Sequence, residues 1–210
     1  MSDLEKALAD IGDIRQQLAA GAMFRGFGPV VMATTGGLAL AVAIAQVIWP
    51  QTLATDDIVF VSVWIVTAVV ATALIGLEMI ARSRRHHRGL ADAMLFNAAE
   101  HFLPVGATGA VVAVVTMRAA PDIAWILPGF WSLLIALGLF AGFRFLPRTV
   151  ALCAAWYFVA GVAVLLYGAN ERMLSPPMMA LPFGVGQLLL AGVLRFAYGP
   201  ETGGDNVEAG

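Results

Sequence analysis

The chain alternates long runs of apolar residues with short polar connections. Runs of about 18 or more apolar residues with almost no charge are typical of transmembrane helices. A helix satisfies its own backbone hydrogen bonds in lipid, and no alternating pattern of the kind found in membrane β-barrels competes here. We therefore predict an all-α, polytopic transmembrane bundle of six spans, at about residues 29–49, 58–81, 90–118, 123–143, 149–167 and 178–195.

A polar, amphipathic segment precedes the first span. Within residues 3–20 the apolar side chains recur at helical spacing, which predicts a helix lying on a membrane surface or against a partner; they are Leu4, Ala7, Leu8, Ile11, Ile14 and Leu18. The last residues are polar and Gly-rich, which favours disorder. We divide the chain into a cytoplasmic amphipathic helix with its entry turn (1–25), a six-helix transmembrane domain (26–198) and a disordered cytoplasmic tail (199–210).

Prolines, glycines and tryptophans within the spans indicate local features. Pro104 is expected to kink the third helix, and Pro128 with Gly129 to interrupt the fourth. Small-residue steps predict helix packing faces; these are Gly138 with Gly142, and Gly109 with Ala113. Five aromatic residues mostly fall near span ends, which predicts interfacial belts; they are Trp49, Trp64, Trp125, Trp156 and Tyr167.

Composition supports a membrane protein and narrows its chemistry. Only 12% of the 210 residues are charged, against roughly 25% in soluble domains. The net charge of -2 is small and is the sum of acidic and basic regions, so no nucleic-acid partner is predicted. The single cysteine, Cys153, excludes an internal disulfide and argues against a cysteine-based metal cluster. Lys6 is the only lysine, so no span offers a lysine for a Schiff base.

The distribution of charge predicts the orientation. Basic residues gather in the N-terminal segment, in a polar loop expected at 82–88, in the RFLPR turn (144–148) and at Arg195. The opposite loops hold more acids than bases, namely Asp56, Asp57, Asp122 and Glu171 against Arg118 and Arg172. Because basic loops stay in the cytoplasm, we expect both termini to be cytoplasmic.

Glu78, Glu100 and His101 are the ionisable residues expected near the inner ends of spans. Such residues are costly in lipid and usually face a cavity, a partner charge or a water path. Two carboxylates and an imidazole could hold a divalent metal, relay protons or bind a cationic solute. The competing interpretation makes them interfacial anchors paired with nearby arginines. Which metal a site here would bind is not predicted.

Gln187 and the arginines also have two interpretations each. Pro182, Gly184 and Gly186 loosen the helix around Gln187, which could then line a solute site or hydrogen-bond between closely packed helices. Arginines near the inner surface could bind anionic lipid headgroups or only set the topology; they are Arg82, Arg84, Arg85, Arg88, Arg144 and Arg148.

No catalytic signature is present in the sequence. We therefore predict no catalytic residues. His101 is the only imidazole expected within a span, which disfavours haem held by two histidines of one chain. No cofactor is predicted.

Four segments carry a resemblance to known proteins: FRGFGP, RSRR, RFLPR and PFGVGQ. Together they resemble a group of uncharacterised bacterial six-span integral membrane proteins, over most of the chain from Leu4 to Gly199. The resemblance implies a bacterial cytoplasmic (inner) membrane location and a regulatory role linked to a winged-helix transcriptional regulator. It transfers no active site.

Three hypotheses for function follow. The first is a non-enzymatic protein of the lipid bilayer that acts through a cytosolic partner bound to residues 3–20, in a regulatory or scaffolding role. The second is a small-solute or ion transporter or channel that uses Glu78, Glu100, His101 and Gln187. Six spans are few for such a transporter, so it would be a homo-oligomer. The third is a metal- or haem-dependent membrane enzyme.

Overall fold

The computed structural model describes residues 28–86, 91–142 and 149–198, and these residues form helices without strands. The prediction of an all-α architecture with six membrane spans is confirmed. In chain order the spans are α2 (Pro29–Ile48), α4 (Asp57–His86), α5 (Ala91–Ala119), η2 with α6 (Pro121–Ile126, Leu127–Ala141), α7 (Val150–Glu171), and α8, η4 and α9 (Pro176–Met179, Ala180–Val185, Gly186–Tyr198). A single short turn of helix, α3 (Pro50–Leu53), joins α2 to α4.

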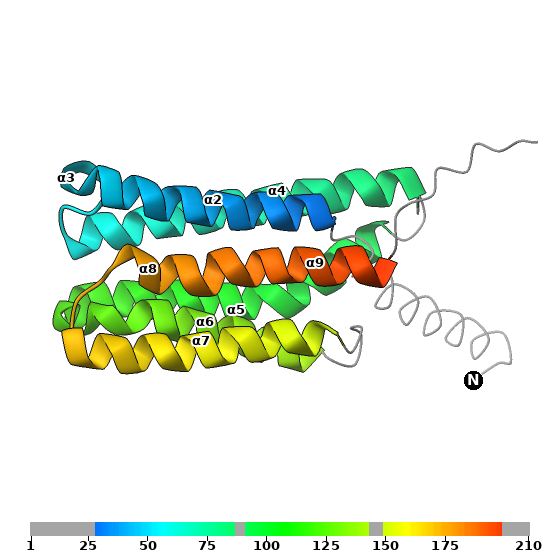
Figure 1. The fold of residues 1–210 in the computed structure, drawn as a ribbon. Helices are drawn as coiled ribbons and strands as arrows, with labels where there is room; N and C mark the ends of the chain where they lie inside the picture. The colour runs from blue at the N-terminus through cyan, green and yellow to red at the C-terminus, as the bar shows by residue number, and fades with distance from the viewer. Residues whose placement is uncertain (1–27, 87–90, 143–148, 199–210) are drawn as a thin grey trace, which may run out of the picture.

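The spans lie side by side and alternate in direction, so α2 begins at the end of the bundle where α9 ends (Figure 1). We call this the terminal end and the other the opposite end. Prolines stand in the first turn of several helices, where the missing N–H costs no hydrogen bond; examples are Pro29, Pro50 and Pro176. Asp56 accepts a hydrogen bond from the Val59 amide (2.8 Å) at the start of α4. The predicted amphipathic helix and tail lie outside the described residues.

Two helices are longer than their apolar parts. The apolar spans are Asp57–Ala81 and Phe102–Ala119, whereas α4 continues to His86 and α5 begins at Ala91. The predicted loop at 82–88 is therefore wrong for residues 82–86, which continue the helix. A helix can continue through polar residues where water solvates their side chains. Hydropathy marks only the end of the apolar run, so it places the end of α4 too early.

The closest helix contact joins α6 and α7. A Cβ added at Gly129 would lie 2.8 Å from the carbonyl oxygen of Gly161 and 2.5 Å from Leu165 Cγ. A Cβ at Gly161 would lie 3.0 Å from the Gly129 carbonyl oxygen. Ser132 and Ala154, both completely buried, continue the same contact. Small residues let the two backbones approach, which is how helices associate in lipid.

A second close contact joins the first span to the last. A Cβ at Gly36 of α2 would lie 2.9 Å from the Gly184 carbonyl oxygen, and a Cβ at Gly184 would lie 2.6 Å from Leu40 Cδ2. Farther toward the terminal end, Met32 packs with Ala191 and Leu194. The first and last spans of the chain thus pack against each other and close the bundle.

The predicted small-residue steps are confirmed as packing positions between α5 and α6. The Trp131 indole N–H donates to the Gly109 carbonyl oxygen (3.0 Å), and the same side chain lies 3.3 Å from where a Cβ of Gly109 would be. Gly138 faces Val105 in the same way. Both contacts lie inside the bundle.

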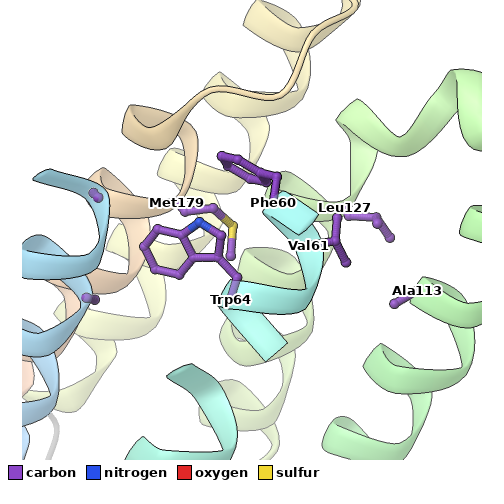
Figure 2. Packing of buried hydrophobic residues seen from close by; sticks show 8 residues of the cluster. Phe60, Val61, Trp64, Ala113, Leu127 and Met179 are labelled. Carbon is purple, nitrogen blue, oxygen red and sulfur yellow. The ribbon is translucent and has the colours of Figure 1, made fainter. Parts of the chain in front are cut away.

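A core cluster near the opposite end joins α2, α4, α5, α6 and α8. Figure 2 shows Trp64 beside Met179, with Phe60, Val61, Leu127 and Ala113 around them. Trp49 and Tyr167 are exposed, as expected of belt residues, but only 3% of Trp64 is exposed. The expectation that Trp64 lies in an interfacial belt is therefore wrong: its ring fills the interior.

Candidate functional site

The predicted Glu/His cluster is only partly within the described side chains. Glu78 is half-buried on α4, next to Met79, which packs into the core with Leu139 and Val150. Glu100 is exposed on α5, and the side chain of His101 lies outside the described part. Among the side chains that the structure describes, no three of His, Cys, Asp or Glu gather as metal ligands do. A site that includes His101 stays a prediction.

The predicted lipid-contacting arginines also stay a prediction. Arg82, Arg84 and Arg85 have described backbone on the last turns of α4, but their side chains do not belong to the described part. Arg88, Arg144 and Arg148 lie outside it altogether.

Gln46 forms a buried link in the first hairpin through both ends of its side-chain amide. Its amide nitrogen donates to the Leu53 carbonyl oxygen (3.0 Å), and its Oε1 accepts from the Trp64 indole N–H (2.9 Å). Only 1% of Gln46 is exposed. Because α2, α3 and α4 all contribute, this link fixes the α2–α4 hairpin. Its role is structural, and the pairing with Trp64 was missed because the two residues are far apart in sequence.

The last span contains a π-helical segment, Ala180–Val185, between α8 and α9. Pro182 lies within it. A proline has no amide hydrogen, and its ring excludes the carbonyl of the residue four positions earlier, so a widened turn accommodates it. The Trp156 indole N–H of α7 donates to the Pro182 carbonyl oxygen (3.3 Å). The expectation that this helix is loosened near Gln187 is confirmed.

Tyr157 of α7 lies against this segment with an unpaired hydroxyl. Only 1% of Tyr157 is exposed. Its ring is tilted against the Phe183 ring, and the two ring centroids are 6.2 Å apart. The hydroxyl oxygen has no hydrogen-bond partner and would lie 2.7 Å from a Cβ at Gly186. Cys153, one helical turn earlier, is buried beside it. Only a glycine at 186 leaves room for this phenol.

Gln187 faces α2 instead of α7. Its Cβ lies 3.1 Å from where a Cβ of Gly36 would be, and its Oε1 is buried without a hydrogen-bond partner. Both interpretations of this region have support, because the glycines do permit close packing and a buried acceptor is left unpaired. We call Tyr157 Oη, on α7, and Gln187 Oε1, on α9, the two unpaired oxygens beside the π segment. Nothing in the sequence marked Tyr157, because one tyrosine in an apolar run is usually a packing residue.

The six spans define the chain as a multi-pass helical membrane protein. No known protein family, curated protein or solved structure matches it. The resemblance to bacterial six-span membrane proteins therefore stays a prediction.

Proposed function

We propose that this membrane protein is non-enzymatic and acts through a soluble partner at its terminal end, which lies in the cytoplasm of a bacterial cell. One observation carries the proposal: the chain outside the spans is concentrated at that end. The connections there cover residues 1–28, 82–101, 142–149 and 197–210, whereas those at the opposite end cover only 49–56, 120 and 172–175. A macromolecular partner would therefore find most of the polar chain at the terminal end.

The helices α4 and α5 add a structured platform there. Helical backbone continues past the apolar spans through residues 82–86 and 91–101. At 1.5 Å per residue these extensions rise about 7 Å and about 16 Å. Helix that projects beyond the lipid needs no apolar face toward the membrane, so it can present side chains to a soluble protein.

Charge supports the orientation and the kind of partner. The connections at the opposite end and the helix ends next to them hold Asp56, Asp57, Asp122 and Glu171 against Arg118 and Arg172. This acidic balance favours an external location. The proposed docking segment, residues 3–20, holds Asp3, Glu5, Asp10 and Asp13 against Lys6 and Arg15. An acidic amphipathic helix is repelled by the anionic inner leaflet. A protein with an apolar groove and a basic rim suits it better, as in helix-in-groove recognition.

The test is native mass spectrometry of the protein released gently from its own membrane. We expect a co-released soluble protein, and we expect Leu8→Asp combined with Ile11→Asp to remove it. Gln16→Asp combined with Gln17→Asp adds the same charge to the polar face and should retain the partner. Thermal unfolding of the bundle should be unchanged in both variants. A wild-type bundle that carries only lipid, or a complex that survives the Leu8/Ile11 change, would contradict the proposal.

Transport of a small solute or ion is the second candidate, and the unpaired Oε1 of Gln187 is the observation that favours it. This buried oxygen would meet a solute only after the last span moves. It predicts cation or proton flux into proteoliposomes that Gln187→Leu reduces and Gln51→Leu, at an exposed site, does not. Absence of flux in the wild type would remove this candidate. For a metal- or haem-dependent enzyme, the described residues offer no supporting arrangement.

A further inference from the structure

The two unpaired oxygens beside the π segment cannot form hydrogen bonds in the conformation seen here. Tyr157 Oη and Gln187 Oε1 each expose less than 1 Å² and have no hydrogen-bond partner. A water molecule needs contact with the atom that it bonds, and at this exposure none can touch either oxygen. Any hydrogen bond to them therefore requires a movement of the protein itself.

The π-helical segment, Ala180–Val185, is the element beside them that can move. Phe183 of this segment touches the Tyr157 ring, and Gly186 and Gln187 follow directly. A π turn holds one residue more than an α turn. Closing it to α-helical spacing shifts the chain on one side by about 1.5 Å along the axis and about 100° around it. Such a shift changes which backbone groups face each oxygen.

The contacts of the segment with α2 and α7 run partly through Gly36, Gly184 and Gly186. Phe183 packs against the Tyr157 ring and Met179 belongs to the core around Trp64, so the rotation must repack both side chains. The hydrogen bond from Trp156 to the Pro182 carbonyl is 3.3 Å long, beyond the usual range for N–H···O bonds, and is readily given up.

We propose that the last span is a two-state helix. In the π form described here, Tyr157 and Gln187 are unpaired; in the second form the segment is α-helical and both side chains gain hydrogen bonds. The change rotates Pro176–Val185 against α9. Met178 and Met179 move with it, and Met179 belongs to the core around Trp64 (Figure 2). The change therefore repacks the opposite end of the bundle and leaves α9 in place. It does not depend on the proposed partner.

The test uses a nitroxide spin label on the full-length protein in lipid, with Cys153→Ala to remove the native thiol. Leu181 lies in the π segment and is 55% exposed, so a label there is mobile in the π form. A rotation of about 100° carries it against neighbouring helices. We expect two components, one mobile and one immobilised, in its electron paramagnetic resonance spectrum. A label at Leu189, beyond the segment, should give one component.

Two variants shift the balance in opposite directions. Pro182→Ala restores an amide hydrogen and removes the ring that excludes the carbonyl of the preceding turn, so it should increase the ratio of immobilised to mobile label about a hundredfold, the penalty of a proline inside an α-helix. Pro177→Ala, in the first turn of α8, is the matched control and should change nothing. Tyr157→Phe removes a hydroxyl that is bonded only in the second form, so it should decrease the same ratio.

A single mobile component at Leu181 in the wild type and in both variants would overturn the proposal. Equal two-component spectra at Leu181 and Leu189 would also overturn it, because the motion would then involve the whole span. If Pro182→Ala does not fold, the response to Tyr157→Phe decides alone.

Discussion

The α6–α7 pair and the α4 and α5 helices are all long and apolar enough to cross a membrane, yet they are packed very differently. Within an apolar stretch of 18 residues in each span, 44% of the residues are buried in the fourth span, against 22% in the second and 17% in the third. The difference follows the placement of small residues. Gly129 and Gly161 bring α6 and α7 together, whereas Gly76 of α4 and Gly106 of α5 face open space. In a bilayer, apolar side chains gain little by leaving lipid, so close approach decides which helices pair.

The largest loss of stability is expected from separating α6 from α7. Gly129→Ala places a Cβ against the Gly161 carbonyl and Leu165, and backbone cannot yield as a flexible side chain does. We expect a loss of about 3 kcal/mol in the free energy of unfolding, at the upper range for overpacked cores. Steric-trapping measurements in bicelles would give the value. A loss below that of the other variants discussed here would show that α6–α7 packing is not dominant.

The α2–α4 hairpin should depend on hydrogen bonds more than the α6–α7 pair does. Gln46→Leu removes both bonds of the Gln46 link and leaves the Trp64 indole N–H unpaired. We expect a loss of about 2 kcal/mol in the free energy of unfolding, the cost of two hydrogen bonds and one buried, unpaired N–H group. Gln51→Leu, at an exposed site, is the control. The same unfolding assay applies, and a loss under a quarter of this value would contradict the assigned role.

Within the α6–α7 pair, by contrast, a hydrogen bond should matter little. The Ser132 hydroxyl donates to the Tyr157 carbonyl oxygen (2.8 Å), but glycine packing holds the helices without it. Ser132→Ala should lower the free energy of unfolding by about 0.6 kcal/mol, the average for interhelical hydrogen bonds in membranes. Ser62→Ala on α4 is exposed and should be neutral. A cost matching that of Gly129→Ala would reverse the ranking of packing over hydrogen bonding.

The smallest expected effect has the opposite sign. Gly106→Ala on α5 adds a Cβ that meets nothing within 4 Å, so only the gain in helix propensity remains. We expect a stabilisation of about 0.5 kcal/mol. A clear destabilisation in the unfolding assay would mean that Gly106 packs against something that the isolated chain lacks, such as a second copy.

Hydropathy was sufficient to predict the spans, and proline and glycine residues were sufficient to predict the local irregularity of the last one. Pro182, Gly184 and Gly186 predicted a loosened helix, and a π segment is found there. The helical end of α4 was missed because arginines end an apolar run without ending a helix. The neighbours of each helix could not be predicted, because lipid-facing and protein-facing positions are both apolar. For the same reason Trp64 was placed at the interface instead of in the core, and Tyr157 was not noticed.

The contact between α2 and the last span has a consequence for how the molecule is made. The α6–α7 pair is consecutive in the chain and can form as soon as α7 has entered the membrane. The face of α2 at Gly36, however, receives its partner only when residues 176–196 have been synthesised and inserted. Until then the first span has only its hairpin with α4 to hold it. A chain that stops early leaves this face of α2 exposed to other helices, and such exposed surface favours misassembly.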